Sequence, residues 1–166
     1  MMRVPLLAAV MFMVLVSSAL AQSVRLIGEY RDWTAYSAVE GTDNICFAMS
    51  KPSTVEPTPD GLTDAYLYLT HRPSENTLHE FNLVAGFTCA PDTPATVSVS
   101  GQSFDLFTEN DAAWLMDPAQ NEDLAGAIRA GSALVIDATT DKGIKVTETF
   151  SLSGATAASR AIDGEC

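Results

Sequence analysis

Short runs of alternating apolar and polar residues dominate this chain, with turn-forming residues between them. Alternation with a period of two is typical of half-buried β-strands. Such runs predict strands at residues 24–30, 33–39, 45–49, 65–71, 80–85, 95–100, 103–108, 133–138 and 144–152. Gly101 and Gln102 join two of the runs as a two-residue loop with glycine first, which predicts a type II′ hairpin. The proline-rich stretch 52–61 is typical of one long surface loop.

The segment 65–71 carries bulky side chains on both of its faces. Tyr66 and Tyr68 share one face, while Leu67 and Leu69 share the other. Bulk on both faces is typical of a strand that lies between two layers. We therefore expect this strand to be covered on both sides.

One helix interrupts the strands. Asp117 is placed to cap its N-terminus, and Pro118 suits the first helical position. Leu124 and Ile128 are spaced to form one apolar stripe, and Gly131 is the expected C-terminal stop. The pattern predicts a single short helix between the last two groups of strands.

The alanine-rich tail at residues 154–162 predicts a short helix before the terminal Cys166. Many short strands with a single helix favour a β-sandwich or a barrel. We therefore expect a mostly β fold: a single-domain β-sandwich or flattened barrel with one short helix and a short C-terminal helical tail.

The first 21 residues have the features of a cleavable signal peptide. Arg3 supplies a positive n-region, and residues 6–16 form an unbroken apolar run. That run is shorter than the roughly 20 residues that a membrane-spanning helix needs. The sequence Ala-Leu-Ala then ends at Ala21, which fits a cleavage site. An uncleaved N-terminal anchor is the alternative.

Cleavage between Ala21 and Gln22 leaves residues 22–166, a length that fits one domain. Gln22 stands where a lipoprotein requires a cysteine, so we expect no lipid anchor and no stable membrane insertion after cleavage. The expected location is the periplasm, or the outside of the cell if the protein is secreted further.

The chain is acidic. Its formal net charge is −12, and loss of Arg3 with the signal peptide makes the mature chain more negative still. A surface of this sign repels phosphate backbones, so we expect no nucleic-acid partner. It favours a cationic partner, or it keeps an exported protein in solution.

No catalytic or cofactor motif is complete in the sequence. Residues 101–105 begin like a nucleophile elbow, but Asp105 replaces the second glycine and the setting is a hairpin. His79 and Glu80 begin like a zinc-protease motif, yet Leu83 stands where the second histidine must be. We therefore expect no catalytic residue and no cofactor.

Four residues need weighing between structural and binding roles. His71 and His79 can ligate a metal ion if a hairpin brings their strands together, but structural histidines are commoner, so we expect no metal site. Trp33 and Trp114 can form a stacking site for a ligand. Large aromatic side chains more often fill the core of a small domain, which is the role we expect for both.

A family resemblance emerges around Cys46. Residues 46–52, CFAMSKP, resemble the Cys-aromatic-Ala-x-Ser-x-Pro motif of the invasion-associated locus B (IalB) family of exported Gram-negative proteins. Further matches stand in the family's order, and they are Trp33, residues 70–73, Gly86, Phe87, residues 104–107, Ala113, Trp114, residues 127–131, Gly143, Thr147, residues 150–152, Gly154 and Cys166. The order of the matches carries the resemblance, which spans nearly the whole mature chain. It implies export and attaches no catalytic residue.

The chain has three cysteines, which in an exported protein allow one disulfide and one unpaired thiol. Cys166 stands at the position of the C-terminal cysteine of the IalB family, and Cys46 lies in the shared motif. We expect these two to pair, because the bond would hold a terminal residue that otherwise frays. Cys89 would then be buried beside Phe87 as a small apolar residue. Pairing of Cys46 with Cys89 is the alternative.

The residues and the resemblance together predict an exported, non-enzymatic binding or interaction protein whose protein or small-molecule partner is unknown. In a host-associated bacterium, the resemblance implies an association with virulence. Two alternatives stay open: a periplasmic hydrolase whose active site has no sequence motif, and an acidic inhibitor or envelope-stress protein. A Ser–His pair or a perturbed carboxylate in a pocket would favour the hydrolase, and an exposed apolar patch would favour a partner surface.

Overall fold

The computed structural model describes residues 23–166, so the expected signal peptide and its cleavage point between Ala21 and Gln22 lie outside the described residues. The described chain is mostly β, which confirms the expected fold class. Its strands are β1 (Val24–Tyr30), β2 (Trp33–Glu40), β3 (Asp43–Ser50), β4 (Thr54–Glu56), β5 (Tyr66–Arg72), β6 (Thr77–Val84), β7 (Ala95–Val99), β8 (Gln102–Glu109), β9 (Ala112–Leu115), β10 (Ala133–Thr139) and β11 (Lys145–Ser151).

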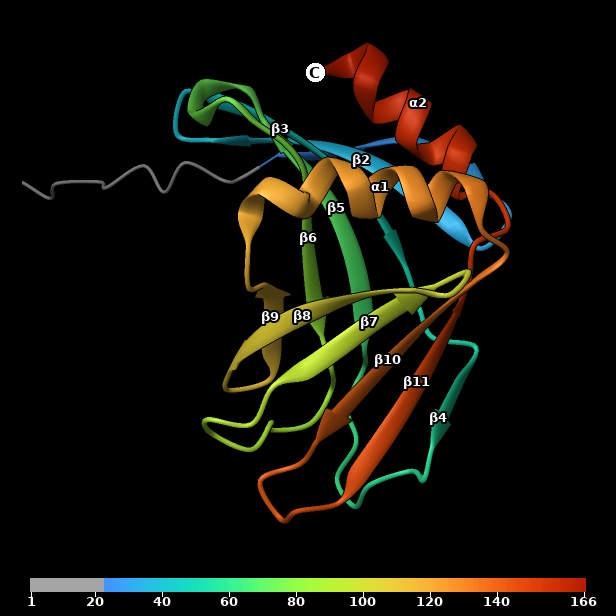
Figure 1. The fold of residues 1–166 in the computed structure, drawn as a ribbon. Coiled ribbons are helices and arrows are strands. Elements are labelled where there is room, and N and C mark those ends of the chain that lie inside the picture. The colour runs from blue at the N-terminus through green and yellow to red at the C-terminus, as the bar shows by residue number, and fades with distance from the viewer. Residues whose placement is uncertain (1–22) are drawn as a thin grey trace, which may run out of the picture.

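All eleven strands belong to one antiparallel sheet in the order β1-β2-β3-β5-β6-β9-β8-β7-β10-β11-β4. The sheet is folded over, so that β7, β8, β10 and β11 lie in front of β5 and β6 (Figure 1). Its edges are β1 and β4, and the sheet does not close into a barrel. The two halves enclose one hydrophobic core, in which Trp33, Phe81 and Phe150 are the largest fully buried side chains.

Two helices cover one end of the folded sheet (Figure 1). The first is α1 (Asn121–Ala130), which follows a 3-10 turn at Pro118–Gln120 and packs mainly on β6. The second is α2 (Ala155–Glu165), which packs on β1, β2 and β3. Both the expected helix and the expected helical tail are therefore present. Neither helix of the described chain is long and apolar enough to cross a bilayer.

The ends of α1 show one expected contact and one unexpected one. Asp117 accepts the backbone N–H of Ala119 at 3.0 Å, so it caps the 3-10 turn that leads into α1, whereas Gln120, which directly precedes α1, makes no side-chain cap. Leu124 and Ile128 are fully buried. Gly131 ends the helix at a φ of −87°, which any residue can adopt. Glycine is required there because a Cβ would stand 2.6 Å from Val99 Cγ1 on the strand below.

Two short strands lie outside the expected set. The sequence predicts only a loop at residues 52–61, but Thr54–Glu56 pairs with the open edge of β11. The four residues of β9 pair with β6 and β8 and complete the sheet. Segments this short contain too few alternations to reveal a period, so their sequence alone does not distinguish them from loops.

The hairpin between β7 and β8 is present, but its loop lies one residue earlier than expected. Val99 pairs with Gln102, so the loop consists of Ser100 and Gly101. Both loop residues have positive φ, at 50° and 81°. Two positive φ angles are typical of a type I′ turn, not the expected type II′ turn.

The expectation that β5 is covered on both sides is wrong. Leu67 and Leu69 are fully buried in the core, whereas Tyr66 and Tyr68 on the other face are only half-buried. The second layer covers one face of this half of the sheet. The tyrosines pack instead against aromatic neighbours on their own face.

Candidate functional site

The outer face of the sheet, which turns away from the core, carries aromatic side chains from five strands. We name them the aromatic row, and they are Tyr36, Phe47, Tyr66, Tyr68, Phe107 and Trp114. The ring centroids of neighbouring members lie between 5.3 and 6.0 Å apart. These separations are typical of aromatic pairs that attract one another.

Strand register explains how the aromatic row forms. The rings on β2 and β3 are directly opposed. Farther along the sheet, Asn82 of β6 lies opposite Tyr68 on one side and Trp114 on the other. Trp114 in turn lies opposite Phe107. The row is therefore one surface on neighbouring strands, interrupted only by the amide of Asn82.

The end of the aromatic row is exposed and flanked by acids. Phe107 is 41% exposed and stacks on Trp114, with an angle of 20° between the rings. Glu80 and Glu109 line a hollow of about 290 Å³ beside these two rings. Apolar rings surrounded by carboxylates therefore face solvent at this end.

The two tryptophans differ in role. Trp33 is fully buried, and its Nε1 donates a hydrogen bond to the Ser151 carbonyl oxygen at 2.9 Å, so the expected core role is confirmed. Trp114 belongs to the aromatic row, so the core role expected for it is wrong. The reason is the short strand β9, which places Ala113 in the core and the Trp114 ring on the opposite face.

A second group of candidate functional side chains lies beneath the two helices, where β5 and β6 pair irregularly. One residue of β5, His71, stands opposite two residues of β6, Leu78 and His79, which is a β-bulge. His79 has a φ of +51°, in the left-handed region that side chains other than glycine rarely adopt. Beside this bulge the two histidine rings lie together on the core face of the strands, although no metal site was expected from the sequence.

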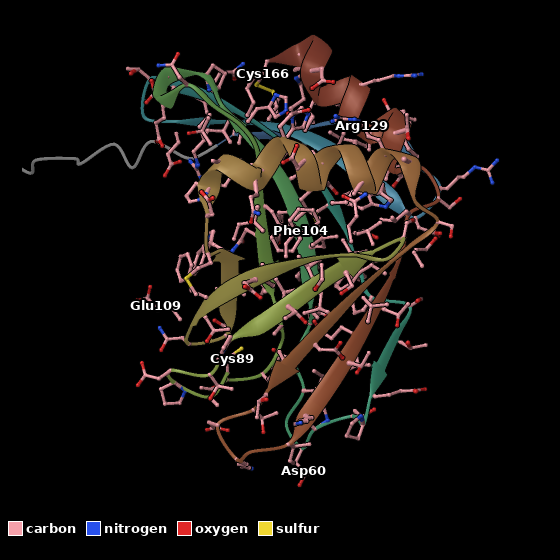
Figure 2. All side chains as sticks on the ribbon, in the orientation of Figure 1. Asp60, Cys89, Phe104, Glu109, Arg129 and Cys166 are labelled. Carbon is pink, nitrogen blue, oxygen red and sulfur yellow. A yellow bond between two sulfur atoms is a disulfide. The ribbon has the colours of Figure 1, made fainter. Side chains whose placement is uncertain are left out.

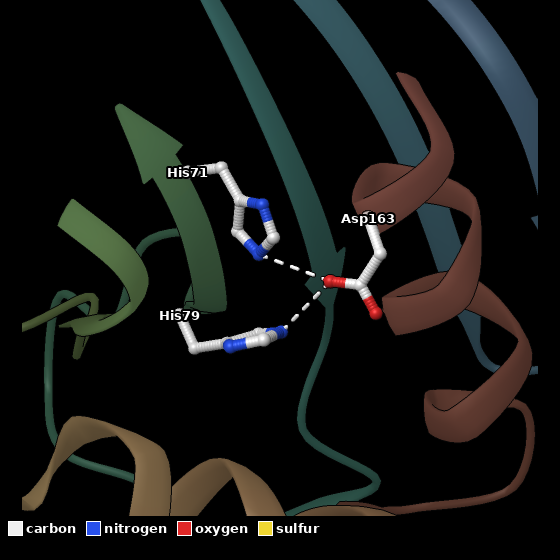
Figure 3. A group of neighbouring side chains, drawn as sticks. All are labelled: His71, His79 and Asp163. Carbon is white, nitrogen blue, oxygen red and sulfur yellow. Dashed lines mark hydrogen bonds and ion pairs between the residues drawn. The ribbon is translucent and has the colours of Figure 1, made fainter. Parts of the chain in front are cut away.

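The histidine cluster consists of His71, His79 and Asp163 (Figure 3). Asp163 Oδ1 on α2 lies 3.1 Å from His79 Nε2 and 3.4 Å from His71 Nε2. The two imidazole rings are perpendicular, with centroids 4.4 Å apart. Both histidines are buried, whereas the side chain of Asp163 is 45% exposed.

Electrostatics differ between the two histidines. Burial, reinforced by the neighbouring His79, lowers the pKa of His71 below its ordinary value, which favours the neutral ring. His71 Nε2 has no hydrogen-bond partner among the described residues. On the other histidine, Nδ1 lies 2.7 Å from Glu122 Oε2 of α1. His79 is therefore held between carboxylates from two helices.

Together with the buried Ser159, His79 and Glu122 resemble the Ser-His-acid triad of a hydrolase. Ser159 Oγ lies 3.4 Å from His79 Nε2, and Glu122 contacts the other ring nitrogen. However, Asp163 is closer to the same Nε2, and Ser159 is fully buried. Neither Ser159 nor His79 lines any of the four most pronounced hollows on the described residues. A nucleophile needs an available base and access to substrate, and this serine has neither.

A disulfide joins Cys46 of β3 to Cys166 at the end of α2, with Cα atoms 5.9 Å apart, and this is the pairing that the sequence analysis expected. It lies near the C-terminus, and Cys89 lies well away from it, between the disulfide and the end of the molecule that carries Asp60 (Figure 2). Cys46 also stands opposite His71 in the pairing of β3 with β5. The bond therefore anchors the last turn of α2, next to Asp163, beside the histidine cluster.

The other half of the core contains a buried acid and a buried thiol. Glu148 is 1% exposed, and neither of its carboxyl oxygens has a hydrogen-bond partner among the described residues. Burial raises the pKa of this carboxyl to about 8. Cys89 is unpaired and buried, as expected, and burial with the nearby Glu148 raises the pKa of its thiol to about 11. A protonated thiol is a poor nucleophile, so this pair has no evident catalytic use.

Sequence reasoning identified His71 and His79 but missed the residues that surround them. Glu122, Ser159 and Asp163 lie 43, 80 and 84 positions from His79 along the chain. No motif links such distant positions, because helix docking brings them together. The aromatic row did leave a signal in the alternation of Tyr66 and Tyr68 on one face of their strand.

Comparison with known proteins supports the fold and goes no further. No family model and no curated protein matches the chain. Among solved structures, the crystal structure of invasion associated protein B from Bartonella henselae is similar, with a TM-score of 0.58 over 83% of this chain and 95% of that chain. The two sequences are 15% identical. The resemblance to IalB noted in the sequence therefore extends to the fold.

Proposed function

We propose that this chain is an exported, non-enzymatic binding protein related to IalB, and that it holds a basic protein partner on the aromatic row. The observation that carries this proposal is the row itself. Six aromatic side chains lie on a face outside the core, where they are not needed to fill the interior. Aromatic residues are enriched in protein interfaces and supply many of the contacts that dominate affinity.

Charge indicates the chemistry of the partner. The chain has a net charge of −12, and Glu80 and Glu109 stand beside the exposed ring of Phe107 and the half-buried ring of Trp114. Complementary charge at the rim of an interface speeds association and disfavours wrong partners. A partner with an apolar centre surrounded by lysine or arginine therefore fits this surface best.

Export is supported by two independent features. Residues 1–21 have the pattern of a signal peptide ending at Ala21, and the structure contains the Cys46–Cys166 disulfide. Disulfides persist in oxidising compartments such as the periplasm and are rare in the cytosol. We propose cleavage before Gln22 and a location in the periplasm or outside the cell. In a host-associated bacterium, the relation to IalB would make the chain a candidate for a role in virulence.

The hydrolase alternative is favoured by one observation, the contact of Ser159 with His79. Against it stand the complete burial of the serine and the occupation of the same imidazole nitrogen by Asp163. The binding function requires no rearrangement of the described structure, whereas hydrolysis would require α2 to move away from the sheet. We therefore place the binding function first.

Affinity capture from a periplasmic extract tests the proposed function. The exported protein is purified, and its intact mass should correspond to a chain that begins at Gln22. It is then immobilised, and the captured proteins are quantified by mass spectrometry. Phe107→Ser should reduce recovery of a basic protein by about 30-fold, the effect of losing an interface contact worth about 2 kcal/mol. Ile144→Ser is the matched control, because Ile144 is 40% exposed, like Phe107 at 41%, but lies outside the aromatic row.

The control variant should capture the same basic protein as the wild type. Equal recovery with Phe107→Ser and with the wild type would refute the role of the aromatic row. Recovery of acidic proteins alone would refute the charge argument.

A further inference from the structure

The histidine cluster directs three donor atoms toward one point (Figure 3). The Nε2 atoms of His71 and His79 and a carboxylate oxygen of Asp163 all lie within 4.8 Å of one another. Ligands placed about 2.0–2.2 Å from a tetrahedral metal ion are separated by roughly 3.3–3.6 Å. Small side-chain movements would therefore bring the three donors to metal-binding distances.

One donor is a buried atom without a partner. His71 is 2% exposed, and its Nε2 accepts or donates no hydrogen bond among the described residues. The atom points at Asp163 (Figure 3). Buried polar atoms are almost always satisfied in folded proteins, so such an exception calls for an explanation. A bound ion would satisfy this nitrogen.

The second donor is held by an unusual backbone. His79 lies in the β-bulge with a φ of +51°, a conformation that a regular strand would avoid. Strained positions and bulges are found where a side chain has to be aimed at a functional site. Alternation along β6 places His79 on the core face with Phe81 and Leu83, and the pairing of Thr70 with Glu80 puts the next residue, His79, beside His71.

A carboxylate behind the second histidine completes the arrangement. Glu122 contacts His79 Nδ1 at 2.7 Å, on the side of the ring away from Asp163. Arg129 donates to the other Glu122 oxygen, also at 2.7 Å. A carboxylate that receives the second N–H of a metal-binding histidine is a recurrent support, because it fixes the tautomer and the orientation of the ring.

We propose that His71, His79 and Asp163 bind one divalent transition-metal ion. Two imidazoles and one carboxylate suit Zn²⁺, Cu²⁺ or Ni²⁺ better than Mg²⁺ or Ca²⁺, which prefer oxygen ligands alone. Three protein ligands leave a position for water or for a ligand atom of another molecule. The ion enters from the side of Asp163, whose side chain is 45% exposed.

The disulfide makes the site part of the folded domain. Asp163 lies on the last turns of α2, and the bond from Cys166 to Cys46 holds that end of the helix against β3. Because Cys46 stands opposite His71, this covalent link holds Asp163 close to His71. Reduction of the disulfide should weaken metal binding for this reason.

Calorimetric titration of the metal-free, oxidised protein with Zn²⁺ tests the site. We expect one ion per chain, bound at micromolar concentration or tighter. Glu122→Gln, which removes the support behind His79, should weaken binding by about 10–100-fold. Asp163→Asn and His71→Ala, which remove ligands, should weaken it further. Asp123→Asn is the matched control, because Asp123 is an exposed carboxylate on the same helix as Glu122.

A second readout identifies the ligands. Co²⁺ in place of Zn²⁺ should give the visible absorption of a four-coordinate site in the wild type and in Asp123→Asn, and should lose it in Asp163→Asn. Asp163 is partly exposed, so circular dichroism of this variant should match the wild type even if His71→Ala fails to fold. The proposal is overturned if the wild type binds no Zn²⁺, or if Asp163→Asn binds it as tightly as the wild type.

Discussion

At the scale of single residues, Glu148 has the most unusual environment. It lies on β11 between Ile136 of β10 and Val55 of β4, with its side chain turned into the core. Removal of a carboxylate from water disfavours the charged form, which explains why its pKa rises from 4.5 to about 8. The native protein therefore holds a proton at neutral pH that the unfolded chain has released.

This proton makes stability depend on pH in a predictable direction. The contribution of Glu148 is complete below about pH 4.5 and is lost as the pH rises toward about 8. Over that range, the free energy of unfolding should fall by about 1.4 kcal/mol per pH unit from this residue alone. Glu148→Gln keeps the shape without the charge and should remove this slope. Urea unfolding at about pH 5, 6 and 7 measures it.

The control for this measurement is Glu29→Gln, which changes an exposed carboxyl group. This variant should keep the slope of the wild type. A stability difference between the wild type and Glu148→Gln that stays constant over the same pH range would contradict the buried, protonated state of Glu148.

Sequence patterns at the residue scale showed which side chains share a face, but not what covers that face. Tyr66 and Tyr68 were correctly placed together, opposite Leu67 and Leu69. Alternation sets this parity, because successive side chains of a strand point to opposite sides. Burial depends on a second layer that folds over from distant strands. The sequence pattern alone therefore could not predict that the tyrosines lie on the outer face.

At the scale of elements, the C-terminal helix depends on its covalent anchor. The Cys46–Cys166 bond spans 120 residues of sequence, and Cys166 is the last residue of the chain. Helix α2 otherwise rests on β1, β2 and β3 through a small set of buried residues, which includes Ala158 and Ile162. Ends of chains that are not tied down fray, so the bond is the main restraint on the last turn.

Cys166→Ser should therefore loosen this end of the molecule. The chain-entropy model gives a loss of up to about 5 kcal/mol in the free energy of unfolding for a loop of this length. Hydrogen exchange should accelerate in the last turn of α2 before it does so in the sheet. Cys89→Ala, which changes the unpaired cysteine, is the control and should leave exchange in α2 unchanged. Equal exchange of α2 in Cys166→Ser and in the wild type would contradict the anchoring role.

Elements were predicted well where alternation is long and poorly where geometry is irregular. The first strand was placed at its observed bounds, Val24–Tyr30. Alternation along β6 places His79 on the core face beside His71, but the cluster was not predicted, because α2 delivers Asp163 from the end of the chain. Helix docking is a tertiary event that leaves no period in the sequence. The sequence therefore identified the two histidines as candidates but did not show that they form a cluster with Asp163.

At the scale of the whole molecule, the folded sheet separates two surfaces with different chemistry. The inner face of the sheet encloses the core, and the histidine cluster lies at the end that the helices cover. The outer face presents the aromatic row. The likeness to invasion associated protein B of Bartonella henselae covers most of the chain, so the overall arrangement of strands is shared with a protein only 15% identical. Function on a shared fold resides in such surfaces and not in the fold itself.

The central claim is that the aromatic row contacts a basic protein partner, and photo-crosslinking inside cells that express the full chain tests it most directly. A photoreactive benzoylphenylalanine is placed at position 107 or, as the control, at position 144, which replaces Phe107 at 41% exposure or Ile144 at 40%. The account predicts a discrete adduct with a basic protein from position 107 and none from position 144. No adduct from position 107, or the same adduct from both positions, would contradict it.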